Sequence, residues 1–461
     1  MNWTKEDLAQ LFKAYDVRGL YPEQINEELA YETGRAFVEI LNIRGEKKQL
    51  VIGHDMRPSG PSLVEAFARG VCEQGVDAIL IGLCSTDALY FATGKLQIPG
   101  VMFTASHNPA QYNGIKLARA GAAPVGQATG LAEISEAVLN RVEKYSGPKG
   151  QILHQNLMDD YGKFLRQLVD LSQIRKLKVV IDAGNGMGGF TVPVVMEGLN
   201  LEIVPLYFEL DGSFPNHEAN PIEPKNLIDL QKAVKDSKAD LGIAFDGDAD
   251  RAFFVDEAGN LITPSAITAL IAARELKREP GAAIIYNLIS SRAVPEVIQE
   301  QGGRAIRSRV GHSFIKQLMK EQNAIFGGEH SGHFYFRDFW FADSGMLAAL
   351  HVLAALGETP QEVKISELLT IYNRYSSSGE INTRVKSPKA TSKRVSEYLN
   401  KKFEVANDDL DGLTFSTPDW WVNVRPSNTE PLLRFNAEAE SPQLLLEIQE
   451  QVLEVIREDE L

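Results

Sequence analysis

The sequence contains little cysteine and no long apolar segment. Its two cysteines, Cys72 and Cys84, are too few for a disulfide framework or a structural zinc site. The first residues are polar and acidic, unlike a signal peptide. The longest apolar stretch, residues 345–357, contains His351 and is much shorter than the roughly 20 residues of a membrane span. These absences predict a cytoplasmic protein without a membrane partner.

Basic residues are also in the minority. The 47 lysines and arginines face 62 acidic residues, which gives a net charge of −15 and argues against nucleic acid or an anionic membrane as the main partner. An anionic small substrate stays possible in a local basic pocket. With 44% hydrophobic and 24% charged residues, the composition excludes collagen-like and mainly disordered chains. A length of 461 residues suggests about three domains, or four small ones.

One pattern occurs three times along the chain. An apolar run, a helical stretch and a second apolar run are followed by a further helix and a third apolar run, which is typical of βαβ units with parallel strands. The first strands are predicted at residues 50–53, 178–182 and 282–286, with helices at 61–74, 191–199 and 293–300. The second strands are predicted at 76–81, 201–206 and 304–308, and the third at 100–104, 241–245 and 324–326.

Each predicted third strand is followed by a polar loop. The three loops are residues 104–109 (TASHNP), 246–251 (DGDADR) and 328–333 (GEHSGH). Ligands of open α/β sheets bind beyond the carboxyl ends of the strands. The three repeats are therefore expected to bring one loop each to a shared cleft.

The C-terminal region differs from the repeats. Residues 379–385 and 421–424 are predicted as strands, residues 433–439 alternate as a half-exposed strand does, and a helix is expected at 442–457. We place the domains at residues 1–150, 151–257, 258–372 and 373–461.

The aspartate loop favours a metal site. Asp246, Asp248 and Asp250 repel one another unless a cation lies between them, and Mg²⁺ prefers such oxygen ligands. A solvated acidic turn is the alternative. An EF-hand is rejected because Arg251 stands where that loop needs glycine, and because the preceding segment is a strand.

Ser106 is either an exposed nucleophile or a polar turn residue. Neighbours in an extended chain point to opposite faces, so Ser106 and His107 are not expected to form a nucleophile–base pair. No G-x-S-x-G elbow surrounds Ser106, which weakens a hydrolase interpretation.

Two further loops carry polar groups suited to a phosphorylated sugar. Residues 425–429 (RPSNT) offer donors to a phosphate, although an ordinary hairpin loop is the alternative. Glu329, Ser331 and His333 recur at a spacing of two, so an extended segment would present all three on one face. A plain polar loop explains them equally well.

A competing motif lies at residues 184–189 (GNGMGG), which fits the dinucleotide fingerprint G-x-G-x-x-G after a strand. Asp182 at the strand end is unfavourable to a pyrophosphate, and the first repeat lacks such a loop. A tight turn between strand and helix is the alternative.

With these loops in order, the sequence resembles the α-D-phosphohexomutase superfamily, within it the phosphomannomutase/phosphoglucomutase group. Residues 15–19 (YDVRG) resemble its opening motif. The loops at 104–109, 246–251, 328–333 and 425–431 resemble its phosphoserine, metal, sugar and phosphate loops. His330 stands where this group often has Met and where members acting on glucosamine phosphate often have Gln.

The resemblance implies three related α/β domains with mixed, mainly parallel sheets. A smaller C-terminal α+β domain, like the TATA-box-binding protein, would complete a central cleft. Ser106 would carry the phosphoryl group, and Mg²⁺ would be bound by Asp246, Asp248, Asp250 and the Ser106 phosphate. The implied residues at the reacting end are Arg18, Lys116, Arg251, His312 and His333. Those that bind substrate are Tyr15, Glu329, Ser331, Arg425, Ser427, Asn428, Thr429 and Arg434.

The implied activity is the reversible conversion of hexose 1-phosphate and hexose 6-phosphate through a 1,6-bisphosphate, which also serves as activator. Mannose is the first expected sugar and glucose the second. Lys116, His312 and His333 are alternative general bases. The alternative functions are a phosphoglucosamine mutase and, in another class, an oxidoreductase that binds a dinucleotide at Gly184, Gly186 and Gly189. A monomer or small homo-oligomer is expected.

Overall fold

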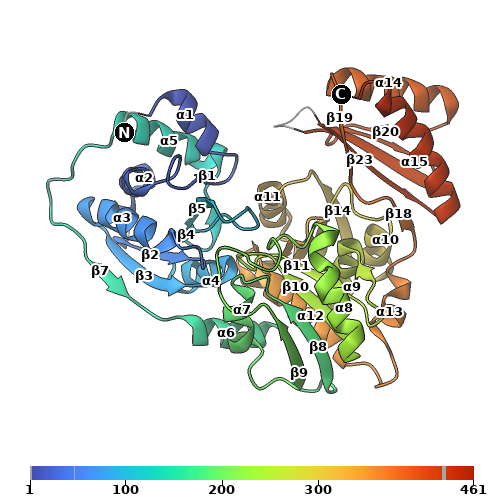
Figure 1. Ribbon diagram of the computed structural model, residues 1–461, viewed down its shortest axis with the longest axis horizontal. Coiled ribbons are helices and arrows are strands. Elements are labelled where there is room, and N and C mark those ends of the chain that lie inside the picture. The colour runs from blue at the N-terminus through green and yellow to red at the C-terminus, as the bar shows by residue number, and fades with distance from the viewer. Residues whose placement is uncertain (1–2, 46, 428–431, 461) are drawn as a thin grey trace. The chain divides into compact units, whose positions relative to one another are not determined.

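The computed structural model describes residues 3–45, 47–427 and 432–460. The chain forms two compact units (Figure 1). The first comprises Met1–Ile262 and Ser331–Leu368, and the second comprises Thr263–His330 and Leu369–Leu461. Within the described ranges, no helix is both long enough and apolar enough to span a membrane.

The first sheet of the first unit has the strand order β1-β5-β4-β2-β3-β7, with β6 beside β5. The neighbours of β2 are parallel to it, whereas β5 is antiparallel to both β4 and β1. Helices α1, α2, α3 and α5 contribute with this sheet to one apolar core. The elements are α1 (Lys5–Leu11), β1 (Val17–Leu20), α2 (Glu27–Ile40), η1 (Ile43–Gly45), β2 (Gln49–His54), α3 (Gly60–Glu73), β3 (Asp77–Leu83), α4 (Thr86–Leu96), β4 (Gly100–Phe103), β5 (Tyr112–Arg119), β6 (Ala123–Pro124), η2 (Gln127–Thr129), α5 (Leu131–Asn140) and β7 (Ile152–His154).

The second sheet of the first unit has the order β12-β11-β10-β8-β9, and β8 is parallel to both β10 and β9. Helix α8 packs its Leu230 and Val234 against apolar residues of this sheet. The elements are α6 (Met158–Leu168), β8 (Leu177–Asp182), α7 (Gly188–Val195), β9 (Leu201–Leu206), η3 (Pro224–Leu227), α8 (Ile228–Ser237), β10 (Leu241–Phe245), β11 (Ala252–Val255) and β12 (Leu261–Ile262).

Helix α7 begins and ends earlier than the predicted helix at 191–199. Gly188 and Gly189 form its first turn, where the surroundings leave little room for a side chain. A Cβ on Gly189 would lie 2.1 Å from the carbonyl oxygen of Phe208, and one on Gly188 would lie 3.3 Å from the Cβ of Phe245. These glycines thus serve close packing.

The first unit also contains β16 (Phe334–Phe336), η4 (Arg337–Phe339), β17 (Ala342–Asp343), α12 (Gly345–Gly357) and α13 (Ile365–Leu368). Helix α12 is the apolar stretch noted in the sequence, and all of its residues are buried. The Ser344 side chain caps the helix by accepting a hydrogen bond from the amide of Leu347 at 3.0 Å.

The second unit contains three parallel strands in the order β14-β13-β15. The elements are α9 (Pro264–Arg278), β13 (Ala283–Asn287), α10 (Ala293–Glu300), β14 (Arg304–Ser308), α11 (His312–Gln322) and β15 (Phe326–Gly328). Strand β15 starts two residues later than predicted, because the amide of Ala324 still closes the end of α11 by donating to the carbonyl of Met319 at 2.8 Å.

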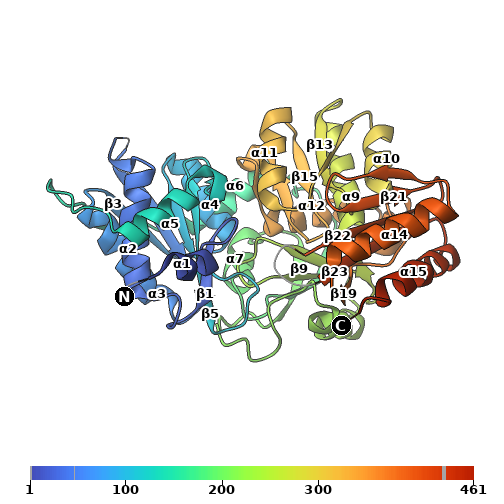
Figure 2. The ribbon, with the colours of Figure 1, turned by 90° about the horizontal axis from the view of Figure 1, so that it is seen from above.

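The C-terminal sheet of the second unit has the order β18-β23-β22-β21-β20, with β19 also beside β23. Helices α14 and α15 pack side by side (Figure 2) and share an apolar core with alternate residues of β22 and β23. The elements are η5 (Leu369–Ile371), β18 (Ser376–Ser377), β19 (Ile381–Arg384), α14 (Pro388–Lys402), β20 (Ala406–Asp408), β21 (Leu413–Ser416), β22 (Trp420–Pro426), β23 (Leu432–Ala439) and α15 (Pro442–Arg457).

The three repeats predicted from the sequence share one strand order. In each repeat the first strand is central and parallel to the second and the third: β3-β2-β4, β9-β8-β10 and β14-β13-β15. The polar loops therefore follow equivalent strands at the carboxyl edge of each sheet, where such folds bind ligands.

Candidate active site

The Ser106 loop follows β4 in a sharp turn. Ser106 has φ +48°, a left-handed conformation that is uncommon for any residue except glycine. The turn is closed by the amide of Ser106, which donates to the Thr104 hydroxyl at 2.8 Å, and by the amide of Asn108, which donates to the Ala105 carbonyl at 3.0 Å. The expectation that Ser106 and His107 point apart is wrong, because it assumed an extended chain. The Ser106 Oγ lies 3.2 Å from the His107 Nδ1.

The aspartate loop begins directly after β10 and meets Ser106. Asp246, Asp248 and Asp250 are buried, and their carboxylate oxygens lie within 4.8 Å of one another. The Asp246 Oδ2 accepts hydrogen bonds from the Ser106 Oγ at 2.8 Å and from the Arg251 Nε at 2.9 Å. The structure thus brings together residues that are 140 positions apart in the sequence.

Lys116, on β5, neutralises part of this negative charge. Its ammonium group lies 2.6 Å from the Asp248 Oδ2 and 2.7 Å from the Asp250 Oδ2. The Thr86 hydroxyl donates to the same Asp248 oxygen at 2.5 Å. The second carboxylate oxygens, Asp248 Oδ1 and Asp250 Oδ1, are buried and accept no hydrogen bond from the described residues. Buried oxygens of this kind fit a hard cation such as Mg²⁺.

The electrostatics of the site follow from burial and close charges. Burial raises the pKa of Asp246 to about 7, against the effect of Arg251. Burial would also raise the pKa of Asp248, but the Lys116 ammonium holds it well below its usual range. Although burial opposes it, the two aspartates raise the pKa of Lys116, so this residue is a cation at neutral pH. Burial lowers the pKa of His107 to about 2, as do the Arg251 and Arg18 cations, so its imidazole is neutral.

The two loops touch through their backbones at Gly247. A Cβ on Gly247 would lie 2.4 Å from the carbonyl oxygen of Ser106, so only glycine fits. The Gly247 carbonyl accepts a hydrogen bond from the amide of Met187 at 2.9 Å. A Cβ on Gly186 would in turn lie 2.7 Å from the Gly247 carbonyl oxygen. The 184–189 motif therefore packs under the aspartate loop, which favours the tight-turn interpretation over a dinucleotide site.

Further predicted residues surround this centre in the first unit. Arg18 donates from Nη1 to the Asn108 Oδ1 at 2.6 Å and also pairs with Asp16. Arg251 forms an isolated antiparallel bridge with His333. The His333 Nε2 lies 3.7 Å from the Asp250 Oδ1. Tyr15 is partly buried in the turn before β1.

The chain from Glu329 to His333 is a turn rather than the extended segment that the spacing suggested. Gly332 has φ +82°, and a Cβ there would lie 2.6 Å from the Phe253 ring. The turn brings the Ser331 Oγ to 2.9 Å from the His333 Nδ1. Ser331 and His333 belong to the first unit, whereas Glu329 belongs to the second.

In the second unit, Arg425 and Arg434 face each other across β22 and β23. Like charges in this register repel. Glu380 bridges them, with its Oε2 3.2 Å from the Arg425 Nη2 and its Oε1 3.2 Å from the Arg434 Nη1. Asp411 lies 3.5 Å from the Arg425 Nη1. The carboxylates thus hold two guanidinium groups together at the predicted phosphate loop.

The remaining predicted residues of the second unit are less completely described. Glu329 accepts a hydrogen bond from the amide of Gly311 at 3.1 Å, and the amide of Ser427 donates to the Leu432 carbonyl at 2.8 Å. His312 begins α11, but its side chain lies outside the part that the structure describes, as do Asn428 and Thr429. Burial lowers the pKa of His330, so this imidazole is neutral at pH 7.

The sequence reasoning missed several residues that hold the site together. Arg57, Thr86, Glu380 and Asp411 bind predicted residues directly, and Asp343 lies 4.0 Å from the His333 Nε2. A signal existed for Arg57, since it follows a predicted strand just as the three polar loops do.

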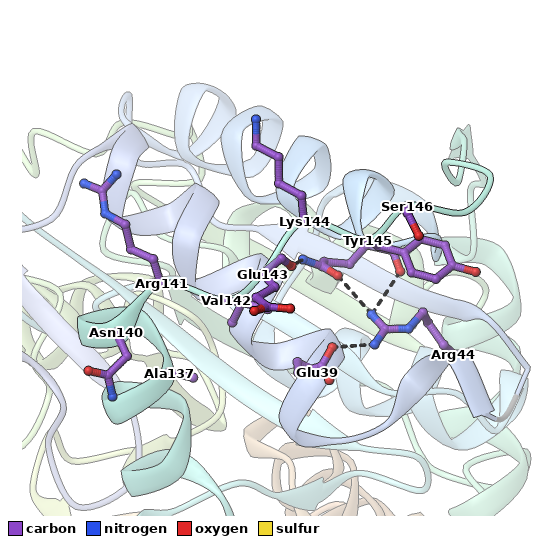
Figure 3. Close-up of a pocket in the computed structure, with 11 residues that line it drawn as sticks. Glu39, Arg44, Ala137, Asn140, Arg141, Val142, Glu143, Lys144, Tyr145 and Ser146 are labelled. Carbon is purple, nitrogen blue, oxygen red and sulfur yellow. Dashed lines mark hydrogen bonds and ion pairs between the residues drawn. The ribbon is translucent and has the colours of Figure 1, made fainter.

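A separate cavity of about 470 Å³ lies beside α2 and α5 (Figure 3). None of the predicted site residues lines it. Arg44 pairs with Glu39, donates to the Gln74 side chain at 3.0 Å, and lies 4.9 Å from the centre of the Tyr145 ring. Gln74 also donates to the Glu143 carbonyl at 2.9 Å. These contacts attach the segment after α5 to η1 and to the C-terminal end of α3.

A serine hydroxyl beside buried carboxylates that could hold a metal ion, at the strand ends of repeated α/β units, is compatible with phosphoryl transfer. Four domain families match the chain in order. Domains I, II and III of phosphoglucomutase/phosphomannomutase match residues 9–144, 159–259 and 263–375, and the C-terminal domain matches residues 380–455.

Similar proteins and a solved structure agree with these matches. The chain is 38% identical to a phosphomannomutase of Vibrio cholerae over 93% of this chain and 94% of that protein. It is also 38% identical to a phosphomannomutase/phosphoglucomutase of Pseudomonas syringae, over 95% and 93% of the two chains. A crystal structure of a family protein from Burkholderia thailandensis superposes with a TM-score of 0.87 and 32% identity, covering 97% of each chain.

The chain therefore belongs to the phosphoglucomutase/phosphomannomutase family of the α-D-phosphohexomutase superfamily. It is a hexose phosphate mutase, an isomerase that acts by phosphoryl transfer on a small phosphorylated sugar. The predicted resemblance and the predicted fold class of three α/β domains and a distinct C-terminal domain are confirmed. The glucosamine alternative has no better support than the hexose assignment.

Proposed function

We propose that the protein interconverts mannose 1-phosphate and mannose 6-phosphate, with glucose phosphates as second substrates, through a phosphorylated Ser106 and a hexose 1,6-bisphosphate. The observation that carries this proposal is the contact of 2.8 Å between the Ser106 Oγ and Asp246, inside a buried cluster of three carboxylates. The sugar preference is supported by the phosphomannomutases among the relatives.

The residues around Ser106 would handle the charge of the transferred group. Phosphoryl transfer spreads negative charge over equatorial oxygens, which nearby cations stabilise. Arg18 and Arg251 supply such cations within the Ser106 environment. Asp246, Asp248, Asp250 and the phosphate on Ser106 would bind Mg²⁺, which would neutralise charge on that phosphate.

A proton must leave the attacking hydroxyl of the sugar. Lys116 is held as a cation between Asp248 and Asp250 and has no free site for a proton in this state. His333 is one candidate acceptor, because its imidazole lies in the same cluster, with Nδ1 2.9 Å from the Ser331 Oγ and Nε2 3.7 Å from the Asp250 Oδ1. His312 stays an alternative.

The unreacting phosphate would be bound by Arg425 and Arg434 together with Ser427, Asn428 and Thr429. The Glu380 bridge between the two arginines supports this assignment. Glu329 and Ser331 would bind sugar hydroxyls, and Tyr15 would contact the substrate. One phosphate site must accept either end of the bisphosphate, since the intermediate has to turn between the two transfers.

Several expectations stay predictions beside this proposal. They are the domain limits 1–150, 151–257, 258–372 and 373–461, activation by hexose 1,6-bisphosphate, a monomer or small homo-oligomer, and a cytoplasmic location.

The test compares kcat/KM for mannose 1-phosphate and glucose 1-phosphate on one preparation, with Mg²⁺ and trace glucose 1,6-bisphosphate. We expect turnover of both sugars and loss of at least about 10³-fold in Ser106→Ala, because the phosphoryl carrier is gone. The exposed Ser172→Ala serves as control and should match the wild type. Substantial activity of Ser106→Ala would refute the assignment, and turnover of glucosamine 1-phosphate alone would refute the sugar.

A further inference from the structure

Arg57 is a buried arginine that lies under the Ser106 loop. It follows Asp55 at the end of β2 and is 1% exposed. The guanidinium carries five N–H donors in a fixed planar arrangement. Its Nε donates to the Asp55 carboxylate at 3.2 Å, which leaves four donors directed away from β2.

Those four donors all bind carbonyl oxygens of one loop. The Nη2 donates to the carbonyls of Ser106 at 3.0 Å and Asn108 at 2.7 Å. The Nη1 donates to the carbonyls of Pro109 and Tyr112, both at 2.9 Å. The loop is thus wrapped around a single guanidinium group, and every donor of that group is used.

The contact with the Ser106 carbonyl bears on the nucleophile itself. Ser106 holds the left-handed conformation of φ +48°, which costs energy for a residue with a side chain. Its carbonyl accepts from the Arg57 guanidinium and packs so closely on Gly247 that a Cβ there would lie 2.4 Å away. These two contacts restrain the peptide whose side chain donates to Asp246 at 2.8 Å.

The Asn108 contact extends the same support to a cation of the site. Asn108 receives Arg57 on its backbone carbonyl and Arg18 on its side-chain oxygen, at 2.7 Å and 2.6 Å. One guanidinium group therefore sets the position of Ser106 and, through Asn108, of Arg18. The Phe214 ring, centred 5.2 Å from the Arg57 Cζ, covers the guanidinium.

We propose that Arg57 is a positioning residue for phosphoryl transfer, which aligns Ser106 and Arg18 without touching the substrate. This inference rests on the proposed role of Ser106 as phosphoryl carrier. A lysine would keep the charge but has three donors on one atom, so it cannot reach four carbonyls and a carboxylate. A displacement of about 1 Å at a reacting group lowers the rate by about 10²-fold.

The test compares Arg57→Lys with Arg35→Lys, a matched control at another buried arginine of the same domain. Arg35 pairs with Glu32 at 3.1 Å and also donates to the Val142 carbonyl, but it does not contact the Ser106 loop. The measurements are Ser106 phosphorylation by glucose 1,6-bisphosphate, read by intact mass, and kcat and KM for glucose 1-phosphate per phosphorylated site.

We expect Arg57→Lys to lower kcat per phosphorylated site about 100-fold with KM within threefold of the wild type. Arg35→Lys should keep kcat within twofold even where its melting temperature falls equally. Asp55→Asn, which weakens the contacts of the Asp55 side chain with the Arg57 Nε and backbone amide, should lower kcat about tenfold with the same unchanged KM and serves if Arg57→Lys does not fold.

Two results would overturn the inference. One is a kcat per phosphorylated site within threefold of the wild type in Arg57→Lys. If Arg57→Lys does not fold, the same criterion applies to Asp55→Asn. The other is an equal loss in Arg35→Lys. A wild-type enzyme that turns over sugar phosphate but carries no phosphate on Ser106 would overturn the proposed function first and this inference with it.

Discussion

Gly247 offers a test of the contact between the Ser106 loop and the aspartate loop. In Gly247→Ala the new methyl group would lie 2.4 Å from the Ser106 carbonyl oxygen. An ordinary contact between such atoms is about 3.4 Å, so the loops must separate by about 1 Å. Neither loop moves freely. Gly247 is held by Ala219 and Met187 at 3.2 Å and 2.9 Å, and Ser106 is held by Arg57 at 3.0 Å.

The expected cost has two parts. Overpacking of a tight interior contact destabilises a protein by about 1–3 kcal/mol. The displacement also lengthens the 2.8 Å contact between Ser106 and Asp246, and a misplacement of about 1 Å lowers the rate about 100-fold. We therefore expect kcat/KM to fall 30- to 300-fold, on the order of that estimate, with a lower melting temperature. A coupled mutase assay and thermal unfolding measure the two effects.

A control variant distinguishes the effect of backbone strain at a glycine from the effect of the contact between the two loops. Gly198 has φ +74°, and a Cβ on it would have no atom within 4 Å, so Gly198→Ala introduces backbone strain of about 1 kcal/mol in open space. It should lower the melting temperature but leave kcat/KM within twofold. A Gly247→Ala enzyme with wild-type kcat/KM would refute the reasoning, because the two loops would then be able to separate without consequence for Ser106.

Three further changes test other parts of the site. Glu380→Gln removes the charge that holds the Arg425 and Arg434 guanidinium groups together. In steady-state assays KM for a hexose phosphate should rise about tenfold, which is equivalent to about 1.4 kcal/mol, and kcat should change little. Mg²⁺ added to chelator-treated protein should raise the melting temperature. At a Mg²⁺ concentration of 100 times the Kd for Mg²⁺, the shift is equivalent to about 2.7 kcal/mol, and Asp248→Asn should abolish it. Burial lowers the pKa of His217, but Asp182 at 3.0 Å outweighs burial and raises this pKa above its usual value. The pair therefore stabilises the fold fully below about pH 6.5, and this stabilisation is lost as pH rises through the folded pKa. His217→Gln should therefore lower the free energy of unfolding by about 1 kcal/mol more at pH 6 than at pH 9, read as a larger fall in melting temperature at pH 6.

The first two of these predictions have a matched control. Glu300→Gln removes a carboxylate bound to Arg374, away from the predicted phosphate loop, and should leave KM unchanged. The exposed Asp170→Asn should retain the full Mg²⁺ shift. An unchanged KM in Glu380→Gln, a Mg²⁺ shift that survives in Asp248→Asn, or a His217→Gln difference that grows with pH would contradict the corresponding argument.

Local patterns were enough to predict the repeated architecture. Apolar runs and helical stretches located β2, β8 and β13 within one or two residues, because burial on both faces requires continuous apolar strands. The aspartate loop was also predictable, since three carboxylates at the end of a buried strand need a cation.

Where the predictions were wrong, the backbone had left the extended conformation. Ser106 at φ +48° turns the chain, so that Ser106 and His107, expected on opposite faces, meet. Gly332 at φ +82° replaces the expected extended segment with a turn. Such turns are stabilised by distant groups. Arg57, Gly247 and Phe253 lie far from these loops in the sequence and leave no local signal there.

The sequence by itself determined the central strands and helices of the three repeats and the polar loops that follow them, because these depend on periodicity and on the polar residues at strand ends. Only the tertiary structure decided which side chains meet. The contact of Ser106 with Asp246, the position of Lys116 between two aspartates and the register that sets Arg425 opposite Arg434 each join separate strands. Such contacts depend on how sheets and loops pack, a property of the whole chain that no local segment encodes.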